Sequence, residues 1–565
     1  MNLIQRWQYV LLLAFGLFAV VTACKNNDAP APVTTISGIS ATSAPVGTSL
    51  VITGTNFSST PASNSVTFGG VAATVTAASP TSLTVTVPAG AGSPIVVVSN
   101  GQTATFTGQF ALGNKPVIEV VGNISTNTTW TPNNNYLIRG NVFVQPGAVL
   151  TIQPGTIIKG ATRDQDPAGQ NRGGTLIVLQ GARIEANGTA QQPIVFTSSK
   201  PAGQRSYGDW GGIIMVGKAP HNRIAAAQIE GNVSVQLGTF NEPADNSGTL
   251  RYVRIEFPGI ALTNAANSEV NGLSLYGVGS GTTIEYVQIS YSGDDSFEWF
   301  GGTVNGRYLV ALRGFDDDFD TDWGYTGKVQ FALSIRDTLI ADQSRSNCFE
   351  SDNFDPGEPA VGPNNGLPLT QPIFANVTGL AFRGTPRNAS TAGTGGSGSF
   401  QAAMHLRRNT AISIYNSVFA GWPEGLRLDG TATGTLANAN AGRLDLQGIT
   451  LANVGIPNAT SAVVGAGSGV TTQFAQDFFN APARRNTIVA SSDVAALFNT
   501  TAFNLTNPGL LPPASSPLLV ASNVATGGKL ADPFFQPAPF RGAFGTTNWT
   551  AGWTNFNPQT TDYDK

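Results

Sequence analysis

Residues 294–298 read Asp-Asp-Ser-Phe-Glu, residues 316–320 read Asp-Asp-Asp-Phe-Asp, and residues 346–350 read Ser-Asn-Cys-Phe-Glu. The three related segments are therefore spaced by 22 and then 30 residues. A unit that recurs at this interval is typical of a stacked repeat architecture. If the repeats stack as parallel strands, equivalent residues lie about 4.8 Å apart. Carboxylates at such a short separation need a cation, donated hydrogen bonds or raised pKa values. The repeat therefore predicts both a fold and a candidate site.

The long C-terminal region shows the same organisation. Residues 113–545 contain short β-branched runs separated by Gly, Pro and Asn. This pattern predicts an all-β chain whose large domain is a right-handed parallel β-helix, with each coil burying its inward side chains against its neighbours. A β-propeller repeats at about 40 to 50 residues, which the observed spacing disfavours. Helical periodicity is rare and is clearest at 472–485, and residues 546–565 are expected to cap the last open coil.

Composition narrows the range of partners and of chemistry. Charged residues make up 11% of the chain, the formal net charge is −4, and there is no run of Lys or Arg. These features argue against nucleic acid as a partner. The chain has two cysteines and two histidines. We interpret Cys348 as a buried structural thiol, since neither histidine is near it in sequence.

The first 23 residues have the organisation of a signal peptide. Arg6 provides positive charge, and Tyr9–Val21 is an uncharged, mostly apolar run that is short for a membrane span. The following Val21-Thr22-Ala23-Cys24 resembles the lipobox of bacterial lipoproteins. The resemblance implies that Cys24 carries lipid and holds the protein in the outer membrane, facing the exterior, with residues 24–33 as a tether. An ordinary secretory signal is the alternative.

Residues 34–112 alternate short strands with Gly, Pro and Asn turns, as a β-sandwich does. Gly54-Thr55-Asn56-Phe57 and Phe68-Gly69-Gly70 closely resemble motifs of the IPT/TIG family of immunoglobulin-like domains. The segment has no Trp or Tyr on which a sugar could stack, so we expect a spacer rather than a binding module. Together the two regions resemble surface lipoproteins of Gram-negative bacteria that pair IPT/TIG domains with a β-helix, a resemblance that implies fold and location but no chemistry.

The acidic repeats supply the candidate site residues. For ligand binding, the candidates combine carboxylates with flanking aromatic rings: Asp294, Asp295, Asp316, Asp317, Trp299 and Trp323. For a metal, calcium is the cation that such oxygen ligands suit, and the candidates are Asp316, Asp318, Asp320 and Asp322. An EF-hand is excluded, because Trp323 stands where that loop requires Gly. The alternatives are Asp side chains that cap turns and Trp rings that pack in the interior.

Three functions remain open at this point. The favoured one is binding of an extracellular polysaccharide, or adhesion. The second is a β-helix polysaccharide lyase or glycoside hydrolase that uses the paired carboxylates, although no motif identifies catalytic residues and fold analogy is a weak warrant. The third is a structural component of the surface layer in which the acidic residues only stiffen the coil.

Overall fold

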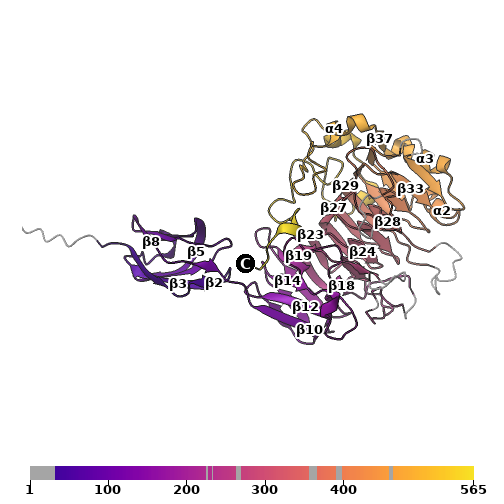
Figure 1. The fold of residues 1–565 in the computed structure, drawn as a ribbon. Helices are drawn as coiled ribbons and strands as arrows, with labels where there is room; N and C mark the ends of the chain where they lie inside the picture. Colours follow the sequence, from indigo (N-terminus) through magenta and orange to yellow (C-terminus); the bar gives the residue numbers. More distant parts are fainter. Residues whose placement is uncertain are drawn as a thin grey trace, which may run out of the picture. The chain divides into compact units, whose positions relative to one another are not determined.

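The computed structural model describes residues 32–223, 227–231, 233–261, 269–354, 366–389, 398–456 and 462–564. They form two compact units, one ending at Asn114 and the other running from Lys115 to Asp564 (Figure 1). Cys24 and the predicted signal segment lie outside the described residues. In the part of the chain that is described, no helix is both long enough and apolar enough to span a membrane.

The N-terminal unit is the immunoglobulin-like sandwich expected from its sequence. Its antiparallel strands follow one another in space as β1 (Thr35–Ile39), β3 (Ser49–Thr55), β6 (Ser82–Thr86), β5 (Val71–Ser79), β4 (Asn64–Phe68), β7 (Ile95–Ser99) and β8 (Gln102–Phe106). The short strands β2 (Ser43–Ala44) and β9 (Ala111–Leu112) form a separate parallel pair. Alternating residues such as Ile52, Val85 and Val97 are fully buried between the layers, which is the period-two pattern of a half-buried strand.

The second unit is a parallel β-helix, as the repeat predicts. Seven long strands start the helix or bend from one of its faces to the next: β10 (Val117–Ile124), β12 (Asn135–Val144), β19 (Gly248–Glu256), β23 (Thr283–Ser290), β25 (Asn305–Leu312), β27 (Lys328–Ile335) and β29 (Ile373–Leu380). Their pairings with shorter strands, all parallel, define three sheets around one core. The antiparallel pair β20 (Ile260–Ala261) and β21 (Glu269–Val270) projects from one loop.

Each sheet is built from equivalent segments of successive coils. The first sheet holds the N-terminal halves of β10 and β12 and the C-terminal halves of β19, β23, β25, β27 and β29, together with β14 (Ile157–Gly160), β17 (Ile194–Ser198), β32 (Val418–Ala420), β35 (Thr450–Ala452) and β37 (Thr487–Val489). The second sheet holds β15 (Thr175–Val178), β18 (Gly212–Val216), β22 (Leu273–Tyr276), β24 (Phe297–Phe300), β26 (Phe319–Asp322), β28 (Phe349–Ser351), β30 (Met404–Leu406), β33 (Leu426–Asp429) and β36 (Val463–Ala466). The third sheet holds the N-terminal halves of β19, β23, β25, β27 and β29, together with β11 (Thr128–Trp130), β13 (Val149–Ile152), β16 (Arg183–Asn187), β31 (Ser413–Tyr415) and β34 (Asp445–Gln447).

The quoted repeat sets the register of the second sheet. Phe297 pairs with Phe319, and Phe319 pairs with Phe349. Their rings point into the core at centroid distances of 5.7 and 5.3 Å, and all three are fully buried. Because side chains alternate along a strand, the residue that follows each of these rings faces outward. Cys348 precedes the last ring and is fully buried, which confirms its interpretation as a structural thiol.

A second aromatic ladder marks the corner between the third and first sheets. Tyr252, Tyr286, Tyr308 and Phe331 all adopt positive φ angles of 50–63°, a conformation that costs a non-glycine residue free energy. Their rings stack on one another at centroid distances of 4.4, 4.4 and 5.1 Å. We infer that this stacking offsets the backbone strain and fixes the corner in each coil.

The C-terminal segment corrects one expectation. Residues 546–564 do not cover the last coil; they lie along the side of the helix, where Trp553 packs on Tyr252 and Tyr286 at 6.0 and 5.9 Å. Farther on, the Tyr563 hydroxyl donates a hydrogen bond to Glu256 at 2.7 Å. The physical reason is that, from β25 onward, the first sheet is apolar on its outer side as well and forms one buried cluster with the returning chain, whereas Arg254, Glu256 and Gln288 of the earlier coils hydrogen-bond to residues 553–563.

The last coil is covered instead by the helix that periodicity indicated. Helix α3 (Thr472–Asn480) begins after Thr471, whose hydroxyl oxygen accepts the backbone N–H of Phe474 at 3.1 Å. Its apolar face adds Ala475, Phe478 and Phe479 to the core cluster of the β-helix. The two shorter helices are α2 (Thr435–Asn440) and α4 (Val494–Leu497).

The position of the C-terminal segment can be tested with Trp553→Ala. This ring is 1% exposed, and removing a buried Trp costs about 3–5 kcal/mol of unfolding free energy. We expect hydrogen exchange to become faster in β19 and β23, on which the ring packs, while β35 to β37 keep their protection. Faster exchange confined to the last coil would contradict this arrangement and support a terminal cap.

Candidate functional site

The outer face of the second sheet carries one continuous column of polar side chains. Parallel pairing places them in successive coils at the same position: Ser274, Glu298, Asp320, Glu350, His405 and Arg427. The column therefore changes from acidic to basic along the helix axis. Neighbours in it are held about 4.8 Å apart by the strand spacing, so charges that are distant in sequence are forced together.

The corner that leads into this sheet adds a second row, built by hydrogen bonds to the backbone. Asp295 Oδ1 accepts the N–H of Asp317 at 2.8 Å, and Asp317 Oδ1 accepts the N–H of Asn347. Asn347 Oδ1 in turn accepts the N–H of Ala402 at 3.0 Å. Each Asp or Asn thus satisfies the turn of the following coil. These contacts fix the carboxylates in place. They leave the second oxygen of Asp295 available, and that of Asp317 accepts only a long hydrogen bond from the Asn347 amide at 3.4 Å.

Six carboxylates converge where the column and the row meet. We call them the acidic cluster: Asp294, Asp295, Glu298, Asp316, Asp317 and Asp320. Together with Glu350 they form three overlapping groups of three, and in each group the candidate ligand oxygens lie within 4.8 Å of one another. Asp295, Glu298 and Asp317 are at most 7% exposed. Of the predicted candidates, the structure therefore brings Asp294, Asp295, Asp316, Asp317 and Asp320 together.

The cluster is poorly compensated by protein cations. None of its carboxylates forms an ion pair with a Lys or Arg among the described residues. Burial, and after it the neighbouring carboxylates, raise the pKa of Asp295, Glu298 and Asp317 well above the ordinary range. The same effects raise the pKa of Asp316 to about 7. At neutral pH the cluster must therefore bind protons or a cation.

The basic end of the sheet is compensated within the protein. Arg407 contacts Glu350 at 2.7 Å and Asp352 at 3.0 Å, and Arg408 also pairs with Asp352. Burial alone would raise the pKa of Glu350, but His405 and Arg407 lower it. The carboxylates at the basic end are therefore balanced by protein cations, whereas those of the acidic cluster are not.

The residues of the cluster fit a hard divalent cation. Asp316 Oδ1 and Asp320 Oδ1 are buried and have no hydrogen-bond partner. Calcium binds carboxylate oxygens at about 2.3–2.6 Å, so oxygens that share one ion lie at most about 5 Å apart. The groups around Asp295, Glu298 and Asp320 meet this condition. Bound there, calcium would neutralise charge and offer its remaining coordination positions to an anionic ligand.

Asp318 and Asp322 lie apart from the cluster, although both were predicted as metal ligands beside Asp316 and Asp320. Asp318 is fully buried and contacts the guanidinium of Arg336 at 3.0 Å, with both side chains inaccessible to solvent. It precedes the first residue of β26, Phe319, so the alternation that aligns Asp320 and Asp322 does not extend to it. Asp322 does face outward, but Arg223 contacts it at 3.2 Å.

The two candidate tryptophans pack against protein groups. Trp299 is 1% exposed and stacks on Tyr325 at 5.4 Å inside the core. Trp323 is 7% exposed, with Arg223 over its ring at 4.8 Å and Phe300 against its edge. Neither ring leaves a free face for a sugar, so the structure gives these residues the packing role that the sequence left open as an alternative.

Several residues of this surface were not among the predicted candidates. Glu350 occupies the column position of Glu298 and Asp320, and the quoted repeat contained this signal. His405 and Arg407 follow in a coil whose segment does not resemble the repeat, so nothing in the sequence placed them here. Glu230 reaches the cluster from a loop; burial, followed by the charge of Asp322, raises its pKa to about 8.

Similarity to solved structures is local. An auxiliary nutrient binding protein from Bacteroides thetaiotaomicron is 27% identical over 15% of this chain and 21% of its own, with a TM-score of 0.14. One from Bacteroides ovatus is 23% identical over the same shares, with a TM-score of 0.13. A putative phosphatase from B. thetaiotaomicron is 26% identical over 17% of this chain and 21% of its own, with a TM-score of 0.14. The chain thus spans only about a fifth of the length of these proteins, and no curated protein matches it.

Family models account for both units of the structure. The IPT/TIG domain model matches residues 34–112, which are the immunoglobulin-like sandwich. The model described as a pectate-lyase-like beta helix domain matches residues 122–497, more than half of the chain. The chain therefore belongs to the family of pectate-lyase-like beta helix domains and carries an IPT/TIG domain before its β-helix.

Proposed function

We propose that this protein binds anionic glycan at the bacterial surface through a divalent cation held by the acidic cluster. One observation carries the proposal. Six carboxylates are fixed together on the outer face of the second sheet and at the corner that leads into it, without a protein cation paired to any of them among the described residues. Such an arrangement costs free energy unless a ligand neutralises it, and a cation is the ligand that oxygen atoms at these distances suit.

The exposure of the cluster supports contact with a large ligand. Asp294, Asp316 and Asp320 are only partly buried, whereas Asp295 and Asp317 lie deeper. A cation held from below by the deeper oxygens would therefore face solvent on its other side. Uronic acid carboxylates are hard oxygen ligands and could complete its coordination, so an acidic polysaccharide is the expected class of glycan.

The arginines of the same sheet favour binding over cleavage. β-Elimination needs a base that is free to accept a proton. Arg407 is held between two carboxylates, whose charges outweigh the effect of burial and raise its pKa, and Arg223 is paired with Asp322. Arg407 therefore remains a cation that can hold an acidic sugar but is a poor base.

We also propose that Cys24 anchors the protein in the outer membrane and that the IPT/TIG domain acts as a spacer. The lipobox-like residues 21–24 and the polar tether after them support the anchor. The absence of Trp and Tyr between residues 33 and 112 supports the spacer. The proposed glycan site would then belong to the β-helix alone.

Glycan binding can be tested by retention on immobilised polygalacturonate in calcium. We expect the wild-type protein to be retained, to elute in chelator, and to bind a neutral polysaccharide at least tenfold more weakly. Asp320→Asn should weaken retention at least tenfold, because Asp320 belongs to two of the three carboxylate groups. Asp477→Asn makes the same chemical change on helix α3, outside the cluster, and should bind like the wild type.

Two results would overturn this function. Equal retention in chelator and in calcium would show that glycan binding does not need a divalent cation. Release of unsaturated sugar products at 235 nm, lost in Asp320→Asn, would instead identify a lyase, and a rise in reducing ends without unsaturation would identify a hydrolase.

Calcium should stabilise the protein more strongly as pH rises. Without a cation, burial raises the pKa of Asp316 to about 7 and the pKa values of Asp295 and Asp317 well above their ordinary range, whereas unfolded carboxyls titrate at about 4. The folded state then binds more protons than the unfolded state, so the contribution of these groups to stability is present at low pH and is lost as pH rises through about 4 to about 7. Calcium competes with those protons.

Thermal unfolding with chelator and with calcium measures this effect. We expect almost no shift of the melting temperature at a pH of about 4.5 and a clear upward shift at about 8, where calcium at a hundredfold its Kd adds about 2.7 kcal/mol. Asp320→Asn should lose most of the shift, and Asp477→Asn should keep it. A calcium effect of equal size at both pH values would show that the acidic cluster is not the site.

A further inference from the structure

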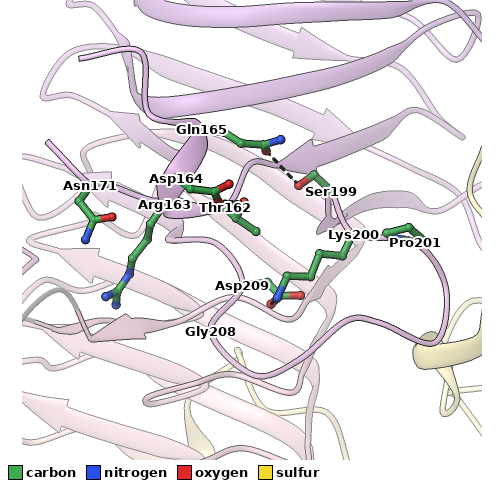
Figure 2. A pocket seen from close by; sticks show the side chains of 10 residues that line it. All are labelled: Thr162, Arg163, Asp164, Gln165, Asn171, Ser199, Lys200, Pro201, Gly208 and Asp209. Carbon is green, nitrogen blue, oxygen red and sulfur yellow. Dashed lines mark hydrogen bonds and ion pairs between the residues drawn. The ribbon is translucent and has the colours of Figure 1, made fainter. Parts of the chain in front are cut away.

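A polar cavity of about 590 Å³ opens at the corner of the β-helix, two coils before the acidic turn of Asp294 (Figure 2). It lies between the loops that follow β14 and β17. These strands are paired through Gly160 and Ser198, so their loops stack on each other. The volume falls within the range of about 300–1,000 Å³ that small-molecule sites occupy.

Hydrogen-bonding groups from both loops line this cavity. Arg163, Gln165 and Asn171 come from the loop after β14, and Ser199 and Lys200 come from the loop after β17. Figure 2 shows Arg163 and Lys200 on opposite sides of the space, with Gln165 and Ser199 close together at one end. The Ser199 hydroxyl donates to Gln165 Oε1 at 3.4 Å, a long bond that a better partner could replace. The residues that line the cavity include no aromatic ring.

The charges of the cavity are unequally satisfied. Lys200 Nζ contacts Asp209 at 2.6 Å, and Asp209 also accepts the hydroxyl of Ser198 at 2.6 Å and the N–H of Ser206 at 2.9 Å. Asp209 is therefore fully occupied. The Arg163 guanidinium has no hydrogen bond or ion pair with any residue that the structure describes, although the carbonyl of Arg163 accepts the N–H of Asp166. Partial burial lowers its pKa, which is the effect of losing water without gaining an anion.

The cavity and the acidic cluster lie along the same corner. Gly208 lines the cavity, and a Cβ added to Gly293 would lie 2.8 Å from the Cα of Gly208. Gly293 directly precedes Asp294. Two coils correspond to about 10 Å at one strand spacing each, so the next sugar units of a polymer held at the acidic cluster would meet this cavity.

We propose that the cavity binds a second acidic sugar unit, whose carboxylate pairs with Arg163. A guanidinium and a carboxylate form two parallel hydrogen bonds, and the amides of Gln165 and Asn171 with the Ser199 hydroxyl are suited to the hydroxyls of the same sugar. This inference rests on the proposed function, because it extends the same glycan along the corner. It differs in needing no cation, since Arg163 supplies the positive charge, whereas the two carboxylates of the lining already have partners, Asp209 with Lys200 and Asp164 with the Thr162 hydroxyl.

Calorimetric titration of the full chain with digalacturonate in excess chelator tests the cavity alone. We expect saturable binding to the wild type, at least tenfold weaker binding of the neutral disaccharide galactobiose, and at least tenfold weaker binding of digalacturonate to Arg163→Gln. Arg163→Lys should lie between the two, because it keeps the charge but not the paired hydrogen bonds. Arg183→Gln is the matched control, since Arg183 is paired with Glu185 on the third sheet, and it should bind like the wild type.

Each outcome decides for or against this site. Equal binding of galactobiose and digalacturonate, unchanged binding in Arg163→Gln, or no binding in chelator overturns it, provided the variant melts at the wild-type temperature. Asn171→Ala, which leaves all charges in place, should also weaken binding, and an unchanged affinity would count against the cavity. Calcium-dependent retention on polygalacturonate without cavity binding would refute this inference alone, and cavity binding without calcium-dependent retention would refute the proposed function alone.

Discussion

The parallel register of the second sheet is the constraint on which the rest of the structure depends. It stacks Phe297, Phe319 and Phe349 inside the helix and, by the alternation of a strand, forces Glu298, Asp320 and Glu350 into one column outside. Burying each aromatic ring is worth several kcal/mol. The apolar core therefore supplies the free energy that holds carboxylates closer than they would lie in solution.

Whether the outward-facing carboxylates are free to bind a ligand depends on whether nearby arginines pair with them. Where a coil carries arginines, as at Arg407 and Arg408, the carboxylates are paired. For Asp295 and Asp317, a backbone N–H group occupies one carboxylate oxygen, and neither side chain pairs with a Lys or Arg among the described residues. The first sheet behaves differently, since from β25 onward its outer face is apolar and packs against the returning C-terminal chain. The unbalanced carboxylates therefore lie on the second sheet and at the corner that leads into it.

The sequence predicted the features that depend on repetition. Two copies of Asp-Asp-x-Phe and the later Cys-Phe-Glu were enough to predict parallel stacking, the acidic cluster and the buried Cys348. Features that depend on contacts across the chain could not be predicted in the same way. The side-on packing of Trp553 requires Tyr252, about 300 residues earlier. Asp318 points inward and pairs with Arg336 because the chain bends before Phe319, which the sequence alone does not show. Trp299 is buried because its face of β24 turns inward, and the sequence alone does not show that either.

The most direct test of the account is a crystal structure of the protein grown in terbium, a calcium substitute whose anomalous scattering locates it without ambiguity. The account predicts an anomalous peak in contact with Asp295, Glu298 and Asp320, and its loss in Asp320→Asn. A well-ordered cluster with no peak there would contradict the claim that the register builds a cation site, because the six carboxylates would then be balanced by protons alone.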